Sequence, residues 1–320
     1  MMKRIFILML ALVPTMLWAQ FAPEAGVAGT TAMHADSSAF VAWATGCVIE
    51  RGSIQIGVTD SLVSYGVDND ALGKADNMVV SLGDGGKAVL TFDSPICNQT
   101  GPDFAVFENP FHNAPHCFLE LAFVEVSSDG ENYFRFPAVT NVPFETQMGG
   151  FGVMDATLIH NFAGKYEVMY GTPFDLDEVE DNALLDKGNV THVRLVDVVG
   201  TIDPEYATYD SEGHLVNDPF PTPYWSSGFD LDAIGVIHDV LHIDVPEHTN
   251  ETIAVYPNPV KDRLTVKAEN LQSVEIYNLV GQQVLVSTSS VVDMSVLNQG
   301  IYFVRINADG KTVTERVVKQ

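Results

Sequence analysis

Short runs of alternating apolar and polar residues recur along the chain and predict β-strands. Before residue 247 they include "KAVLTF", "FAVFEN", "LAFVEVSS" and "THVRLVDVVG", and the segments between them are rich in Gly, Pro, Asn and Asp. Only the stretch that follows "TPFDLD" is compatible with a helix of useful length. Many strands separated by turns are typical of all-β folds, so we expect a loop-rich β-sandwich or jelly roll.

The last part of the chain has its own strand pattern and its own charge. Five short apolar runs, from "RLTVKA" to "KTVTERVVK", predict a small immunoglobulin-like β-sandwich. Residues 253–320 hold seven basic and six acidic residues, whereas residues 21–252 hold seven basic and 36 acidic ones. This shift predicts an acidic domain over residues 20–246, a linker over 247–252 and a second domain over 253–320. The acidic charge also argues against a nucleic-acid partner, which basic residues would bind.

The first residues predict export. "MMKRIFILMLALVPTMLWAQ" has a basic start, an apolar centre and a small residue at Ala19, which indicates a signal peptide over residues 1–19. No other stretch approaches the roughly 18 apolar residues that a membrane span needs. We therefore expect a mature chain without a transmembrane anchor.

Three blocks near the C-terminus carry a family resemblance. "VYPNPVKDRLTV", "VEIYNLVGQQVL" and "LNQGIYFVRINADGKTVTERVVKQ" closely resemble the C-terminal sorting domain of type IX secretion cargo in Bacteroidota. The resemblance implies that residues 253–320 interact with the type IX secretion machinery. It further implies that the protein is secreted or displayed on the outer face of the outer membrane.

The acidic domain has resemblances of its own. "ELAFVEVSSDGENYFRF" resembles a strand–turn–strand unit of galactose-binding-like jelly rolls, and blocks such as "GPDFAVFENPF" and "GFDLDAIGVI" resemble a family of bacterial and archaeal cell-surface proteins. The jelly-roll resemblance makes carbohydrate the leading ligand class. Aromatic rings near candidate loops would stack on sugars, or would instead fill the core or plug loops; they are Trp225, Tyr224, Phe220 and Phe111.

The motif FDLD occurs twice and predicts two different structures. In "TPFDLDEVEDNALLDKG", Asp175 stands three residues before Glu178, which is the spacing of a helix capping box. We therefore interpret Asp175 and Asp177 as cap and first-turn residues of a helix that ends near Gly188.

The second copy, "GFDLDAIGVI", predicts a strand with a paired carboxylate face. On a regular strand, one face would carry Phe229, Leu231 and Ala233, and the other would carry Asp230 and Asp232. An oxygen-rich loop precedes this strand, and calcium prefers such ligands. The sequence thus predicts a Ca²⁺ site, the alternative being that the carboxylates face water or bond loop amides; its candidate ligands are Asp230, Asp232, Asp210 and Asp218.

The segment "ENPFHNAPHC" offers ligands of another kind. His112, His116 and Cys117 lie within six residues and are of the types that zinc or copper prefers. Because exported proteins oxidise their thiols, we expect instead a bridge between Cys97 and Cys117, with Cys47 unpaired and buried. In "HDVLH", His238 and His242 lack the glutamate of a zinc peptidase and predict a strand with partly buried histidines.

No sequence motif of a known enzyme class occurs, and no catalytic residue is assigned. A pair of acidic residues leaves no local signature, so a glycan hydrolase using Glu108, Glu120 or Asp103 remains one alternative. Surface capture of a corrinoid or haem by the histidines is another. We expect a secreted or surface-bound, non-catalytic binding protein that is stabilised by calcium.

Overall fold

The chain divides into two compact units, Met1–Ile243 and Asp244–Gln320. The predicted signal peptide, residues 1–19, and the predicted linker, residues 247–252, lie outside the part of the chain that is described. No helix within that part is long and apolar enough to cross a membrane. The computed structural model describes residues 21–242, 253–268, 270–308 and 311–320.

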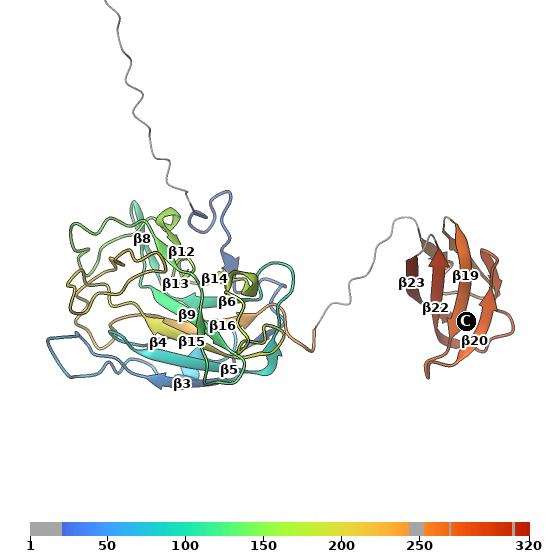
Figure 1. Ribbon diagram of the computed structural model, residues 1–320, viewed down its shortest axis with the longest axis horizontal. Helices are drawn as coiled ribbons and strands as arrows, with labels where there is room; N and C mark the ends of the chain where they lie inside the picture. The colour runs from blue at the N-terminus through green and yellow to red at the C-terminus, as the bar shows by residue number, and fades with distance from the viewer. Residues whose placement is uncertain (1–20, 243–252, 269, 309–310) are drawn as a thin grey trace, which may run out of the picture. The chain divides into compact units, whose positions relative to one another are not determined.

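Two antiparallel sheets of six strands each form the first unit (Figure 1). The first sheet has β4 (Val80–Ser81) paired to β16 and otherwise runs in the order β1 (Met33–His34), β14 (Tyr170–Phe174), β6 (Phe104–Glu108), β16 (Asp230–Val236) and β2 (Ala42–Trp43). The second has β13 (Phe162–Ala163) paired to β9 and otherwise runs in the order β10 (Phe134–Arg135), β9 (Ala122–Ser127), β15 (Val190–Asp197), β5 (Lys87–Ile96) and β3 (Gly46–Glu50).

The main core of the first unit combines apolar side chains from both sheets. Phe104 of β6 stacks on Phe174 of β14 with ring centroids 5.4 Å apart. In the same core cluster, Leu90 and Leu195 of the opposite sheet are fully buried. Two sheets that share one core make a β-sandwich, so the fold class predicted from strand spacing is confirmed.

Short elements complete the first unit. They are the two-stranded pairs β7 (Phe111–Asn113) with β8 (His116–Phe118) and β11 (Val139–Thr140) with β12 (Ile159–His160), and the 3₁₀ helices η1 (Asp68–Ala71), η2 (Ala156–Leu158) and η3 (Leu176–Glu178). No α-helix occurs among the described residues.

The first FDLD copy caps a helix that is much shorter than predicted. Asp175 accepts a hydrogen bond from the Asp177 N–H at 2.9 Å and is the N-cap of η3, which confirms its predicted role. The longer helix is wrong. Beyond η3, Asn182 and Asp186 bond backbone N–H groups two residues ahead, and such local bonds compete with helix formation.

The predicted strand–turn–strand unit is present as β9 and β10. Phe134 pairs with Val126 across the antiparallel strands. In the turn, the Asp129 carboxylate accepts hydrogen bonds from the N–H groups of Glu131 and Asn132, both at 2.8 Å. These bonds replace the ladder where the chain reverses.

The second FDLD copy contains a β-bulge. Along the pairing of β16 with β6, Leu231 lies opposite Glu108 and Ala233 lies opposite Phe107. Two residues on β16 therefore correspond to one step on β6, and Asp232 is the extra residue. A bulge of this kind changes which face the following side chains occupy.

The bulge shifts by one residue the positions of β16 whose side chains enter the main core. Leu231 packs in the main core, but Ala233 joins a separate cluster on the other face of the sheet. Ile234 then returns to the main core. The prediction that Phe229, Leu231 and Ala233 share a face is thus wrong for Ala233, because alternation restarts at the bulge.

The second unit is a smaller antiparallel sandwich, as predicted. Leu264, Ile276 and Val304 are fully buried in its core. One sheet contains β17 (Ala254–Tyr256), β18 (Arg263–Lys267) and β21 (Val291–Asp293), and the other contains β20 (Gln283–Ser287), β19 (Leu271–Tyr277), β22 (Gly300–Ala308) and β23 (Lys311–Lys319).

Replacing Ile234 with alanine is expected to lower the free energy of unfolding of the first unit by about 2–5 kcal/mol, as for other buried Ile-to-Ala changes. The matched control is Val48→Ala on β3, where the side chain is 71% exposed and the expected change is within about 0.5 kcal/mol. Denaturant unfolding followed by tryptophan fluorescence reports the first unit, because all three tryptophans precede residue 243. Equal effects of the two changes would contradict the burial of Ile234 in the main core.

Candidate functional site

Three carboxylates meet in the interior of the first unit. Glu108 ends β6, Glu120 lies just before β9, and Asp230 begins β16. One carboxylate oxygen of each lies within 4.8 Å of the other two. Glu108 is 2% exposed and the other two residues are 8% exposed. We call this group the carboxylate triad.

The order of strands explains how the triad forms. β6 and β16 are hydrogen-bonded neighbours, which brings the end of one beside the start of the other. The chain leaves β6 at Glu108, makes the β7–β8 hairpin and returns with Glu120. Two members of the triad therefore flank one hairpin, and the third comes from the adjacent strand.

Burial and mutual repulsion favour the protonated forms of the triad. Burial, followed by the charge of Asp230, raises the pKa of Glu108 well above its usual value. The pKa of Glu120 is raised in the same way, by burial and then by Asp230 and Glu108. Burial raises the pKa of Asp230 to about 7, although the Ser81 hydroxyl donates a hydrogen bond to it. Three like charges in this space need protons or a cation.

Among the described residues, no lysine or arginine forms an ion pair with a carboxylate of the triad. Arg51 lowers the pKa of Asp230, but its guanidinium donates hydrogen bonds to the backbone carbonyls of Tyr65, Ser81 and Gly66. Within the described ranges, the ion pairs of lysine and arginine all involve other carboxylates. None of these ion pairs therefore offsets the negative charge that the triad would carry when deprotonated.

Two buried carboxylate oxygens beside the triad have no hydrogen-bond partner. They are Oε2 of Glu108 and Oδ1 of Asp218. The other oxygen of Asp218 accepts from the Leu121 N–H at 2.9 Å, and the Asp218 charge raises the pKa of both Glu108 and Glu120. An unsatisfied buried polar atom is destabilising, so these are the oxygens that a cation could bind.

The geometry suits a hard divalent cation. Calcium binds oxygens at about 2.3–2.6 Å, so two of its ligand atoms stand at most about 5 Å apart. The triad meets this limit, and carboxylates can bind through one or both oxygens. Calcium would supply the charge that the protein does not.

Two further buried aspartates hold the loops around the triad. Asp197 accepts from the Phe229 N–H at 2.7 Å and from the Gly85 N–H at 2.9 Å. Asp84 accepts from the Ile56 N–H at 2.8 Å, and burial raises its pKa to about 6. Both carboxylates therefore bond backbone N–H groups of loops. Asp197 in this way orders Phe229, the residue that leads into β16.

The sequence-predicted calcium ligands separate into two pairs. Asp230 belongs to the triad and Asp218 lies beside it, whereas Asp232 bonds elsewhere. The Asp232 carboxylate accepts from the N–H groups of Asp76 and Asn77, both at 3.1 Å. The bulge accounts for this difference, because it removes the regular alternation that would have given Asp230 and Asp232 one face.

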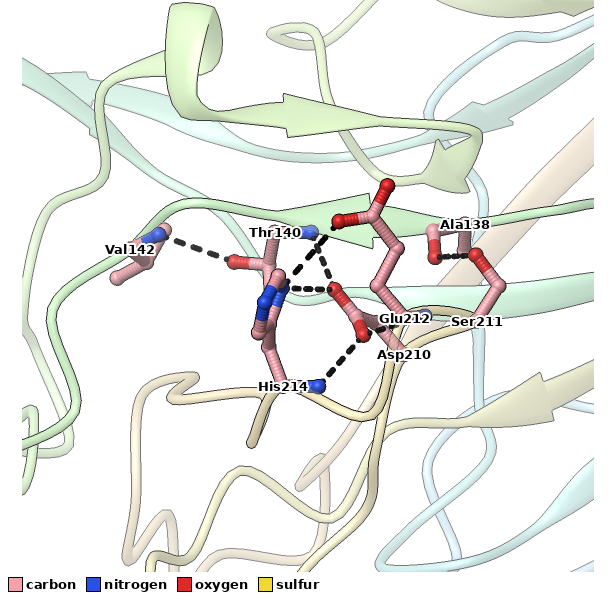
Figure 2. A network of polar contacts seen from close by, with 7 residues as sticks. All are labelled: Ala138, Thr140, Val142, Asp210, Ser211, Glu212 and His214. Carbon is pink, nitrogen blue, oxygen red and sulfur yellow. Dashed lines mark hydrogen bonds and ion pairs between the residues drawn. The ribbon is translucent and has the colours of Figure 1, made fainter. Parts of the chain in front are cut away.

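Asp210 organises a different loop (Figure 2). One of its oxygens accepts from the Thr140 N–H at 2.9 Å, and the other accepts from the N–H groups of Glu212 and His214 at 2.9 and 2.8 Å. The His214 ring pairs with the same carboxylate at 3.2 Å. The contacts of residues 210–214 in Figure 2 join these residues to one another and to Ala138 and Thr140, so Asp210 fixes this loop and is not part of the triad.

Sequence reasoning missed the metal-binding potential of Glu108 and Glu120, which it named only as acid–base candidates. The available signal was their setting, because each acid interrupts an apolar segment, "FAVFEN" or "CFLELAF". The third acid–base candidate, Asp103, lies apart from them. It accepts from the N–H groups of Leu176 and Gln99 and pairs with the His238 ring at 2.9 Å.

Aromatic rings near the triad form a continuous row. Phe111 stacks on Phe118 at 4.9 Å, Phe118 lies 6.1 Å from Phe151, and Phe151 lies 6.2 Å from Tyr224. We call these four residues the aromatic row. Three of its rings are exposed, by 47% for Phe111, 64% for Phe151 and 53% for Tyr224. Of the other predicted sugar-stacking residues, Trp225 is 64% exposed and Phe220 is partly buried.

The expected disulfide is absent. Cys47, Cys97 and Cys117 are all free thiols, and Cys47 is half-buried rather than buried. The bridge fails because Cys97 follows β5 and bonds the His238 backbone, whereas Cys117 lies on β8 opposite His112.

The predicted strand through "HDVLH" is also wrong. β16 ends at Val236, before both histidines. His238 pairs with Asp103, and His242 pairs with Asp239 at 2.8 Å in the turn that follows. The two histidine rings therefore bond different carboxylates, His238 that of Asp103 and His242 that of Asp239.

Comparisons with known proteins identify the second unit. Residues 254–320 match the family described as "Secretion system C-terminal sorting domain". A search of curated proteins finds no match. One of the solved structures found is described as "Biofilm associated protein - BSP domain", with 12% sequence identity and a TM-score of 0.18. That match covers 87% of this chain and 52% of the other, about half its length, and a TM-score this low is no sign of a shared fold.

Without calcium, the free energy of unfolding of the first unit is expected to fall as the pH rises from about 5 to about 8. Unfolded carboxylates titrate near pH 4, whereas burial raises the pKa of Asp84 to about 6 and that of Asp230 to about 7. The folded state thus holds protons that the unfolded state has released, and each such group contributes at most about 1.4 kcal/mol per pH unit.

Denaturant unfolding in EDTA, followed by tryptophan fluorescence at several pH values, measures this slope. Asp230→Asn should flatten it. Asp129→Asn should leave it unchanged, because hydrogen bonds lower the pKa of that exposed carboxyl and keep its titration below this range. A stability that rises between pH 5 and 8 would contradict the electrostatic description of the triad.

Proposed function

We propose that this secreted cell-surface protein, which its C-terminal sorting domain makes a cargo of the type IX secretion system, is a non-catalytic binding protein whose first unit holds Ca²⁺ in the carboxylate triad. The sorting domain implies interaction with the secretion machinery and attachment at the cell surface. The first unit then supplies the binding function outside the cell.

One observation carries the calcium proposal. Glu108, Glu120 and Asp230 are buried together without a cationic partner, and one oxygen of Glu108 is unsatisfied. Carboxylates buried this closely together are stable only with protons or a metal ion. At neutral pH, a divalent cation neutralises the triad and satisfies the free oxygens of Glu108 and Asp218.

The same burial argues against the hydrolase alternative. A general acid or base must reach the substrate within hydrogen-bonding distance. Glu108 is 2% exposed and Glu120 is 8% exposed, so a glycan in solution has little access to either. Metal binding needs no such access once the ion is in place.

Cofactor capture by the histidines has less support. His116, His160, His214, His238 and His242 each pair with a carboxylate. These pairs belong to different loops and strand ends. Among the described residues, no group of possible metal ligands contains two of these histidines.

We further propose that the aromatic row binds carbohydrate. Phe111, Phe151 and Tyr224 are exposed, and the first two are linked through buried Phe118. Exposed rings offer flat apolar faces on which sugar rings stack. Two of its members lie on the β7–β8 hairpin, whose two ends are Glu108 and Glu120. Calcium in the triad would therefore fix the hairpin that presents these rings.

Calcium is expected to stabilise the first unit by about 2.7 kcal/mol when its concentration is a hundred times the dissociation constant. Glu120→Gln and Asp230→Asn should abolish this effect, because each removes a ligand charge while keeping the side-chain shape. Thermal unfolding followed by tryptophan fluorescence, with EDTA and then with Ca²⁺, measures it.

The matched controls are Asp232→Asn and Asp210→Asn. Both alter carboxylates that bond backbone N–H groups outside the triad, so their calcium response should persist even if the starting stability drops. Loss of the response in either control, or no response in the unchanged chain, would refute the triad as the binding site.

Phe151→Ala and Tyr224→Ala are expected to weaken glycan binding at least tenfold, equivalent to about 1.4 kcal/mol each. A glycan array of the full chain with calcium selects the ligand, and calorimetry then gives the affinity. Tyr209→Ala is the control, because that side chain is 49% exposed but belongs to no described aromatic pair. A chain that binds no glycan, or an equal loss in the control, would remove the carbohydrate proposal and leave the calcium proposal intact.

A further inference from the structure

A second cluster of metal-binding side chains lies on the β7–β8 hairpin. Donor atoms of Glu24, His112 and Cys117 all lie within 4.8 Å of one another. Glu24 comes from the N-terminal segment of the first unit, and the other two come from the hairpin strands. None of the three belongs to the carboxylate triad.

The hairpin register explains why His112 and Cys117 meet. They are directly opposed residues of β7 and β8, so their side chains leave the same face. His112 Nδ1 lies 3.9 Å from Cys117 Sγ. On the next opposed pair, His116 bonds Glu24 through Nδ1 at 3.0 Å, which holds the Glu24 carboxylate at this end of the hairpin.

The ligand atoms of Glu24, His112 and Cys117 favour a different class of metal ion than the ligand atoms of the carboxylate triad do. A thiolate, an imidazole and one carboxylate are ligands of zinc and related transition metals, whereas calcium takes oxygen alone. Two ligands of one tetrahedral zinc stand roughly 3.5 Å apart. The described separations are a little larger, so small side-chain rotations suffice to close them.

We infer that Glu24, His112 and Cys117 bind a zinc-class divalent transition-metal ion. His116 acts as a positioning residue, because its bond to Glu24 orients that ligand, as outer-shell partners do at metal sites. Three protein ligands leave one position of a tetrahedral ion open to water or to a ligand from solution.

Burial and access are consistent with this site. Cys117 is 4% exposed and packs in an apolar cluster with Leu119 and Met154, whereas His112 is exposed. The ion would therefore enter from the exposed side, at His112, and bind the buried thiol of Cys117 beneath it. Burial raises the pKa of Cys117 to about 11, and metal binding displaces that thiol proton to solvent.

Cobalt(II) is the probe that tests this inference, because thiolate bonding gives it a charge-transfer absorption band that oxygen ligands do not produce. The full chain is reduced, saturated with Ca²⁺ to occupy the triad, and titrated with Co²⁺. We expect the charge-transfer band together with the visible bands of tetrahedral cobalt, and we expect Zn²⁺ to remove both.

Cysteine variants identify the thiolate. Cys117→Ser should lose the charge-transfer band, whereas Cys47→Ser and Cys97→Ser should keep it. His112→Gln changes an exposed side chain and should weaken Co²⁺ binding at least tenfold without unfolding, which tryptophan fluorescence verifies. His116→Ala should weaken it by about 10–100-fold, as for other outer-shell changes.

Absence of the band in the unchanged chain would overturn the inference, as would its persistence in Cys117→Ser. If Cys117→Ser fails to fold, the His112→Gln result decides, and unchanged Co²⁺ affinity there overturns the site. The calcium response of the first unit is measured separately, so failure here does not bear on the triad.

Discussion

Repulsion among Glu108, Glu120 and Asp230 is the strongest constraint at one end of the first sandwich, because all three carboxylates are buried close together. β6 ends there, β16 begins there and β9 follows within two residues. Strands from both sheets thus converge on a negative charge that the protein leaves without a cationic partner. Protons or an ion must offset that charge, because close burial makes three deprotonated carboxylates unfavourable.

The backbone around this end is adapted to the same problem. Two aspartates spaced i, i+2 on a regular strand would face the same way and repel each other. The bulge in β16 separates them, since Asp230 joins the triad while Asp232 bonds the amides of residues 76 and 77. Neighbouring Asp197 and Asp210 likewise bond backbone N–H groups. Most buried acids of this unit therefore order loops, and the triad differs from them in bringing three carboxylates within reach of one another.

Local pattern in the sequence was sufficient for the fold class and for the cap at Asp175, and a family resemblance was sufficient for the sorting domain. It was insufficient where distant segments meet. Glu108 and Asp230 meet only because β6 pairs with β16, a contact between residues more than 100 positions apart. The bulge depends on that same pairing, so strict alternation placed Ala233 on the wrong face. The expected Cys97–Cys117 bridge failed for a related reason, because nearness along the chain does not orient two side chains toward each other.

The β7–β8 hairpin leaves and rejoins the sandwich through Glu108 and Glu120, with eleven residues between them. If the proposed ion binds between Glu108 and Glu120, the two ends of this segment stay at a fixed separation whatever residues lie between them. The entropic cost of closing such a loop changes by only about 0.6 kcal/mol when its length doubles. The outer part of the hairpin could then be replaced, in natural relatives or by engineering, while the pairing of β6, β9 and β16 is preserved.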